Sequence, residues 1–280
     1  MKYEEAKELK PEEFKRLSGV RIETFETMVK IVKEAVLKKK KPGRPSHLSI
    51  ENQIMLTLEY WREYRTYFHI GAAWGLHESN AYRTIKRIED ILVKSKQFRL
   101  PGKKSLSQEE LAPDSVIIDV TENGIERPKK KQKKYFSGKK KRHVIKVQTV
   151  SDAQVGLILC NNCDKGKKHD FRMFKESELG LRGETEVLAD KGYQGIQKLH
   201  SKSTIPYKKK RKGKLTKEER EHNRKLASKR ILGEHIFCRI KVFRIFKGDY
   251  RNRRKRFGLR FNLISGIYSF ELTLPKFKPS

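Results

Sequence analysis

The stretch VIIDVTE, residues 116–122, places one acid, Asp119, among four apolar residues. A short apolar run that is rich in β-branched residues is typical of a buried strand. An ionised carboxylate in such surroundings is costly unless it is paired with a cation or bound to a metal ion. Two later stretches bring further acids: LADKGYQG has Asp190 at the end of an apolar run, and RILGEHIF has Glu234 inside a helical pattern. We therefore expect Asp119, Asp190 and Glu234 to meet around divalent metal.

Two of these acids also have a simpler interpretation. Asp190 precedes Lys-Gly and would serve as a turn residue that ends a strand. Glu234 lies four residues after Arg230, so the two would form a solvated ion pair on a helix. Composition and spacing alone leave these interpretations open.

Basic residues dominate the composition of the chain. Its 280 residues include 67 Lys and Arg against 34 Asp and Glu, for a net charge of +33. Such an excess indicates a polyanionic partner, above all nucleic acid, because binding to phosphates releases counterions. An anionic membrane surface would also attract the protein. The sequence has neither an apolar run near 18 residues nor a signal-peptide core, and so predicts no membrane partner and a cytoplasmic, nucleoid-associated location.

A helix-turn-helix pattern occupies the stretch from residue 49 to about residue 95. Apolar residues there follow helical spacing three times, and Gly75 suits the left-handed position between the second and third helices. A short helix, a tight turn and a helix with exposed basic residues is the layout of a helix-turn-helix, although any three-helix bundle gives a similar pattern. The positive charge favours DNA binding. The third helix would contact DNA through Arg83, Lys86 and Arg87.

A basic segment, KKKKPGRP at residues 38–45, precedes these helices. Its Pro and Gly residues end the preceding amphipathic helices, which we expect within residues 1–37. Arg44 would enter a narrow minor groove, where an arginine finds enhanced negative potential, or would lie in a solvated hinge.

The composition changes after a second linker. We predict a helical DNA-binding domain at residues 1–95, a linker at 96–113 and a catalytic domain at 114–280. Strand-like and helix-like stretches alternate from residue 114 to about 210, and residues 216–246 form a long helical pattern. This order predicts an α+β or α/β fold with a mixed sheet that is covered by helices.

Two basic runs interrupt the second domain. Eleven Lys or Arg and no acid lie between residues 127 and 151, and a second run spans 208–214. Basic runs are usually solvated surface. Beside a site of carboxylates, runs of this density also suit contacts with a phosphate backbone, and we assign such contacts to Lys139, Lys140 and Arg142.

The acids would suit the cleavage of a phosphodiester. This reaction needs an activated water and a stabilised leaving oxygen, and two Mg²⁺ ions about 3.5 to 4 Å apart provide both. Such ions take carboxylate oxygens from separate structural elements. An acid in mid-strand, one at the end of a neighbouring strand and one on a helix meet that requirement.

Several motifs occur in a recognisable order: VIIDVTENGIERP, YFSGKKKRHVIKVQ, GKKHDFRMF, LADKGYQGI and SKRILGEHIFCRIKVFRIF. This order resembles the bacterial insertion-sequence transposases of the DDE superfamily, in particular the group named after insertion sequence five. The preceding residues, 43–92, resemble the helix-turn-helix segment that is fused to the catalytic domain in the same group. The resemblance covers most of the chain, from about residue 43 to residue 246.

The resemblance implies an RNase H-like fold in which Asp119, Asp190 and Glu234 bind Mg²⁺, with Mn²⁺ as a substitute. It also places Arg230 and Lys241, from the pattern R-x3-E-x6-K, near the cleaved phosphate.

The resemblance leaves open the roles of the position of Ala227 and of the pair His169–Asp170. Ala227 stands where a related signature has a tyrosine, which puts phosphate contacts on this helix in doubt. His169 and Asp170 match a recurrent pair of the group, which would support the fold or bind metal.

By the same resemblance the protein would bind the terminal inverted repeats of an element as a homodimer or higher oligomer. It would nick the ends by metal-activated water and join the freed 3′-OH to target DNA, without a covalent protein–DNA intermediate. Two other functions remain open. One is an inactive DNA-binding remnant that represses the element. The other is a basic RNA-binding protein, although its aromatic residues are scattered rather than grouped for stacking.

The cysteines do not form a complete motif. Cys160 and Cys163 have the spacing of half a zinc site, but a second pair is missing, and Cys238 and His169 are poor substitutes. Reduced thiols without a metal are the other interpretation.

Overall fold

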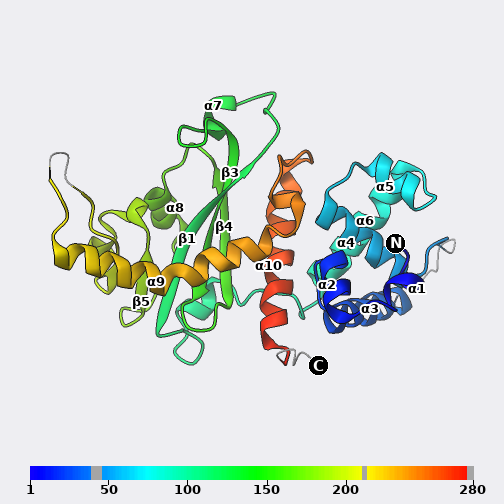
Figure 1. The fold of residues 1–280 in the computed structure, drawn as a ribbon, viewed down its shortest axis with the longest axis horizontal. Helices are drawn as coiled ribbons and strands as arrows, with labels where there is room; N and C mark the ends of the chain where they lie inside the picture. Colours follow the sequence, from blue (N-terminus) through cyan, green and yellow to red (C-terminus); the bar gives the residue numbers. More distant parts are fainter. Residues whose placement is uncertain (39–45, 210–212, 276–280) are drawn as a thin grey trace. The chain divides into compact units, whose positions relative to one another are not determined.

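The structure is a computed structural model that describes residues 1–38, 46–209 and 213–275. Arg44 and residues 210–212 of the second basic run lie outside the described residues. The chain divides into two compact units (Figure 1). The helical unit comprises residues 1–99, 240–247 and 255–275, and the sheet unit comprises residues 100–239 and 248–254. The sheet unit is therefore inserted, in sequence, into the helical unit.

The helices of the helical unit come from both ends of the described chain. They are α1 (Tyr3–Ala6), α2 (Pro11–Ser18), α3 (Ile22–Leu37), α4 (Ile50–Glu63), α5 (Tyr67–Ala73), α6 (Glu78–Lys94), the 3-10 helix η4 (Arg244–Phe246) and α10 (Phe257–Thr273). The short 3-10 helix η5 (Arg254–Arg256) precedes α10. The predicted domain division placed residues 255–275 in the catalytic domain, whereas the structure places them in the helical unit.

Helix ends in this unit follow the sequence signals closely. Ser49 caps α4 by accepting a hydrogen bond from the Asn52 N–H (3.1 Å), and Thr66 caps α5 in the same way. Gly75 adopts a left-handed conformation, with φ of 65°, between α5 and α6. The apolar face of α6 is buried as predicted. These features confirm the helix-turn-helix pattern.

Close backbone contact fixes α10 within the helical unit. A Cβ atom on Gly266 of α10 would lie 1.9 Å from the carbonyl oxygen of Phe98, so only glycine permits this approach. Phe98 also packs edge-on against the ring of Phe270. These contacts place α10 against the residues that follow α6.

The sheet unit contains one mixed sheet in the described part of the chain. Its strands are β1 (Ser115–Gly124), β2 (Phe136–Ser137), β3 (Arg142–Asp152), β4 (Ile158–Lys165), β5 (Glu186–Ala189) and β6 (Ser203–Thr204). The order is β2-β3-β1-β5-β6, with β4 also paired to β3. β1 and β4 each run antiparallel to β3, whereas β5 runs parallel to β1 and β6 parallel to β5. The predicted α+β fold with a mixed sheet is confirmed.

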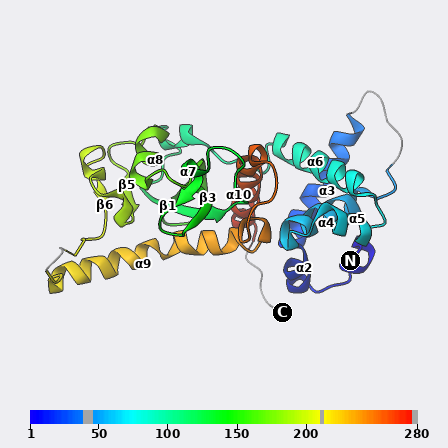
Figure 2. The same cartoon turned by 90° about the horizontal axis from the view of Figure 1, so that it is seen from above.

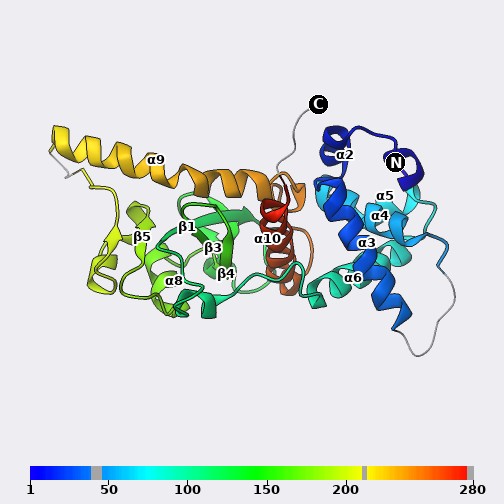
Figure 3. The same cartoon turned by 90° about the horizontal axis from the view of Figure 1, so that it is seen from below.

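Helices cover the two faces of this sheet. They are α7 (Gln132–Tyr135), α8 (Asp170–Ser177) and α9 (Lys217–Ile240), with 3-10 helices η1 (Lys103–Leu106), η2 (Lys191–Tyr193) and η3 (Ile196–Lys198). Figures 2 and 3 show α9 along one face and α8 on the other. Alternate residues of β1 serve the two faces: Ile117 packs with Leu226 of α9, and Ile118 packs in the cluster that contains Phe174 of α8.

The predicted long helix ends earlier than expected. α9 ends at Ile240 rather than near residue 246. The reason is the change of unit at this point, because Phe243, Ile245 and Phe246 are buried in the helical unit. Lys241 therefore follows α9 instead of lying on it.

In the described part of the chain, no helix combines the length and the apolar composition needed to cross a membrane.

Candidate catalytic site and nucleic-acid interface

Asp119 lies in the middle of β1, on the face that α9 covers. Its side chain is 20% exposed, and its Oδ1 accepts a hydrogen bond from the Val120 N–H (2.9 Å). The nearest cation is the guanidinium of Arg230, whose Nη2 is 3.7 Å from the same oxygen. The pKa of Asp119 is raised to about 6. Burial is the largest cause, Arg230 and the Val120 N–H act against it, and the charges of Asp190 and Glu234 act with it.

Asp190 follows β5 directly, at the edge where β5 runs beside β1. Ala189 pairs with Ile118, so the next residue along β5 is level with Asp119. The Asp190 carboxylate caps the turn that follows, because its Oδ1 accepts a hydrogen bond from the Gly192 N–H at 2.7 Å. Asp190 is therefore a turn residue that ends a strand, as the simpler interpretation expected. The same residue also lies beside Asp119.

Glu234 reaches this region from α9. Gly233, its neighbour, packs against β1: a Cβ atom there would be 3.0 Å from Cγ2 of Ile117 and 4.0 Å from Oδ2 of Asp119. The side chain of Glu234 is exposed to solvent. Since its charge raises the pKa of Asp119, Glu234 lies within electrostatic range of that carboxylate.

The three acids thus gather on one face of the sheet, but their spacing is open. Among the described residues, no three His, Cys, Asp or Glu side chains form a group that would hold a metal ion. The chemistry of the donors suits a hard divalent cation, since all are carboxylates and the half-buried Asp119 has its nearest cation 3.7 Å away. The donor set therefore fits divalent metal, although the acids would have to move closer to bind it.

Arg230 has unused hydrogen-bonding capacity beside Asp119. Its side chain is 15% exposed, and its Nε is buried without a hydrogen-bond partner. At 3.7 Å its contact with Asp119 is an ion pair and is too long for a hydrogen bond. A buried guanidinium with a spare donor is suited to bind an anion.

The other residues expected to bind DNA are divided between the two units. In the sheet unit, Lys139 and Lys140 are exposed, and Arg142 pairs with Asp249 at 3.2 Å. In the helical unit, Arg83 and Lys86 are exposed on α6. Arg87 is half-buried, and its Nη2 donates to Oε1 of Gln53, so its guanidinium is partly engaged within the unit.

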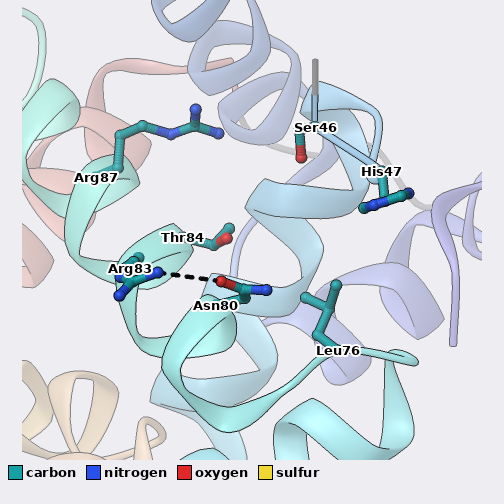
Figure 4. Close-up of a pocket in the computed structure, with 7 residues that line it drawn as sticks. All are labelled: Ser46, His47, Leu76, Asn80, Arg83, Thr84 and Arg87. Carbon is teal, nitrogen blue, oxygen red and sulfur yellow. Dashed lines mark hydrogen bonds between the residues drawn. The ribbon is translucent and has the colours of Figure 1, made fainter. Parts of the chain in front are cut away.

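A hollow of about 370 Å³ lies beside the first turns of α6 (Figure 4). Its lining residues are Ser46, His47, Leu76, Asn80, Arg83, Thr84 and Arg87. Asn80, Arg83, Thr84 and Arg87 form one stripe of the helix, and Arg83 Nη1 donates to Asn80 Oδ1 at 3.5 Å. Asn80 and Thr84 were not among the residues predicted to contact DNA. Their helical spacing with the two arginines was the signal that would have found them.

Lys146 also lay outside the predicted site, since it was considered only as part of a basic run. It is buried on β3, where Asp170 of the predicted His-Asp pair accepts a hydrogen bond from its Nζ (2.8 Å). His169 is the residue before α8. All three cysteines are free thiols, with Cys160 buried and Cys163 and Cys238 exposed.

Comparison with known proteins shows the family in which a helix-turn-helix precedes such a sheet domain. Residues 118–263 match the family described as DDE superfamily endonuclease, and residues 46–97 match the helix-turn-helix of DDE superfamily endonuclease. A protein of Microchaete diplosiphon, named as a transposase for insertion sequence element IS702, is 52% identical over 98% of this chain and 99% of its own length. A protein of Streptomyces albus G, named as a transposase for insertion sequence element IS112, is 25% identical over 82% of this chain and 84% of its own.

The chain belongs to the DDE superfamily of endonucleases, as an insertion-sequence transposase with an N-terminal helix-turn-helix. The resemblance drawn from the sequence motifs is confirmed. Membership implies DNA binding and endonuclease chemistry, and the superfamily typically uses divalent metal.

Proposed function

We propose that the protein binds the terminal inverted repeats of its element through α6, nicks the element ends at the Asp119 site and transfers the freed 3′-OH ends to target DNA. It would do so in the cytoplasm, at the nucleoid, as a homodimer or higher oligomer. The observation that supports this proposal best is Asp119 itself. It is a half-buried carboxylate with a raised pKa, two further acids nearby and an arginine whose buried Nε is a spare donor.

Each side chain has a distinct role in the proposed reaction. Asp119 and Asp190 would hold Mg²⁺, or Mn²⁺ in its place, and Glu234 would complete the site and orient a water molecule. When bound, divalent metal supplies an activated water and stabilises the leaving oxygen. The donors of Arg230 would bind oxygens of the cleaved phosphate.

The bond changes are those of two phosphodiester exchanges. In the first, a water oxygen bonds to phosphorus, the bond to the 3′ oxygen breaks, and the freed 3′ oxygen takes up a proton. In the second, the oxygen of that 3′-OH bonds to a target phosphorus and gives up its proton, while the bond to the target 3′ oxygen breaks and that oxygen takes up a proton. Lys139, Lys140 and Arg142 would align the DNA backbones, with Arg83, Lys86 and Arg87 on the element ends. We also assign Arg44 and Lys241 to DNA contacts.

The test is cleavage of labelled DNA that carries the element's own ends, with Mg²⁺, Mn²⁺ or EDTA. We expect nicking at the ends only with metal, and its loss in Asp119→Asn, Asp190→Asn and Glu234→Gln while the ends are still bound. Nicking in EDTA, or full activity in the three variants, would contradict the proposed site.

A second function is favoured by the open spacing of the acids among the described residues and by Ala227, which is exposed on α9. In this case the protein is an inactive DNA-binding remnant that represses its element. The cleavage assay separates the two functions, because a remnant binds the ends tightly and cuts them with neither metal.

A further inference from the structure

Lys146 is a buried lysine close to the Asp190 turn but on the opposite face of the sheet from Asp119. It is 8% exposed and lies directly across from Glu122 of β1. Its Nζ donates to Oδ1 of Asp170 (2.8 Å) and to the carbonyl oxygen of Lys168 (2.9 Å), and lies 3.6 Å from Oε1 of Glu122. A buried ammonium is costly unless it is paired and hydrogen-bonded, and these three oxygens meet that requirement.

Asp170 connects this lysine to the Asp190 turn. Oδ1 of Asp170 accepts from Lys146, and its Oδ2 faces Gly192. A Cβ atom on Gly192 would lie 3.0 Å from Oδ2 of Asp170 and 2.9 Å from Oδ1 of Asp190. Gly192 therefore lies between two carboxylates. Its N–H donates a hydrogen bond to the carboxylate of Asp190 (2.7 Å).

The same turn has a second attachment to β3. The ring of Tyr193 is fully buried, and its hydroxyl donates to Oε1 of Gln148 at 3.3 Å. Gln148 lies two residues after Lys146, so both side chains are on the same face of β3. Residues 190–193 are thus attached to β3 through the hydrogen bond from Tyr193 to Gln148. Asp170, which accepts from Lys146 of the same strand, lies beside Gly192 of this turn.

We propose that Lys146 and Asp170 are positioning residues that set the location of the Asp190 carboxylate, with Gly192 as the contact between them. This inference rests on the proposed function, in which Asp190 holds metal. Asp170 and Asp190 lie on either side of one glycine, and their negative charges repel each other. The positive charge of Lys146 offsets this repulsion and keeps Asp170 against the turn. Without Lys146, the two carboxylates would repel and the turn would move.

The first test changes only Gly192. Gly192→Ala introduces one methyl group between the two carboxylates, and Gly192 has no left-handed φ that would strain alanine. Gly183→Ala is the matched control, because it lies in the segment before β5, has no left-handed φ and would meet nothing within 4 Å. We expect Gly192→Ala to weaken Mn²⁺ binding to the full-length protein about 10- to 100-fold, the usual effect of changing the support of a metal ligand. Electron paramagnetic resonance of free Mn²⁺ measures this affinity, and Gly183→Ala should match the wild type.

The second test changes Lys146. Lys146→Met keeps the apolar stem and deletes the charge, and Lys165→Met makes the same change at an exposed position of β4. We expect Lys146→Met to weaken Mn²⁺ binding by a similar factor, with Lys165→Met unchanged. Circular dichroism on heating shows whether each variant still folds. If Lys146→Met does not fold, Asp170→Ala takes its place, because it removes the carboxylate through which Lys146 would act on the turn. Unchanged Mn²⁺ binding in that variant would contradict the inference.

The outcomes separate this inference from the proposed function. If the wild type binds Mn²⁺ and Asp190→Asn weakens that binding, but Gly192→Ala and any folded Lys146→Met bind as the wild type does, Lys146 and Asp170 are structural only. If Asp190→Asn leaves Mn²⁺ binding unchanged, the proposed function fails at Asp190 and this inference falls with it.

Discussion

Two carboxylates, one in each unit, have opposite surroundings. Glu89 of α6 is 0% exposed and accepts hydrogen bonds from Trp61 Nε1 (3.0 Å), Arg260 Nε (2.7 Å) and Arg256 Nη2 (2.7 Å). Asp119 of β1 accepts one backbone hydrogen bond and has its nearest cation at 3.7 Å. A carboxylate whose oxygens are fully engaged, as in Glu89, holds helices together. A carboxylate with a single backbone hydrogen bond, as in Asp119, is suited to bind a metal ion.

The largest effect should come from Asp119. We expect Asp119→Asn to lower the rate of end cleavage about 1,000-fold or more, because metal-assisted charge stabilisation contributes several kcal/mol. The free energy of unfolding should not fall, because burial raises the pKa of Asp119 and so makes its charged form unfavourable in the folded protein. Single-turnover cleavage and urea unfolding measure the two quantities. A stable and fully active variant would show that Asp119 is not part of the proposed catalytic site. A destabilised variant would show that the Asp119 carboxylate stabilises the fold, as the Glu89 carboxylate does.

Glu89 should show the reverse behaviour. Glu89→Gln leaves the guanidinium of Arg260, which is 1% exposed, buried without its ionic partner. Breaking a buried pair in this way costs about 3 to 5 kcal/mol. We expect the free energy of unfolding, measured in urea, to fall by this amount. The fall should be the same with and without divalent metal. Glu26→Gln, at an exposed position of α3, is the control and should leave stability unchanged.

A smaller loss should follow a change at the backbone contact of α10. Gly266→Ala improves helix propensity by about 1 kcal/mol, yet its methyl group would overlap the carbonyl oxygen of Phe98. The overlap should prevail, with a net loss of about 1 to 3 kcal/mol, as for other overpacked sites. A fall in the midpoint of thermal unfolding measures it. A rise would mean that α10 is held by its side chains alone.

The smallest effect should come from an exposed charge. Lys86 on α6 has neither the full pairing of Glu89 nor the burial of Asp119. We expect Lys86→Ala to weaken binding to all DNA sequences alike and to reduce the slope of log affinity against log salt by about 1. Fluorescence anisotropy at several salt concentrations tests this. A change in sequence preference instead would place Lys86 against a base.

Local pattern predicted much of the fold and much of the candidate site. The caps of α4 and α5, the left-handed Gly75 and the mixed sheet all follow from short-range signals. The closeness of Asp119 and Asp190 follows from two strands that pair in parallel. The open spacing of the acids was not predictable, because it depends on where α9 packs on the sheet.

Two features escaped prediction for physical reasons. Lys146 looks like any other lysine of its basic run, and only its pairing across from Glu122 makes it buried. The place of α10 depends on ion pairs such as that between Glu89 and Arg260, which are 171 residues apart in sequence. α10 is apolar on most sides, so its own pattern does not specify which core it joins.

The division of the helical unit has a consequence for protein synthesis. A ribosome makes α6 early and α10 only after the whole sheet unit has emerged, and domains generally fold as their residues become available. Until then Glu89 lacks both of its arginine partners. A polypeptide released before α10 is translated would therefore lack a stable helix-turn-helix. Incomplete translation products would then lack the folded unit that we propose binds the ends of the element.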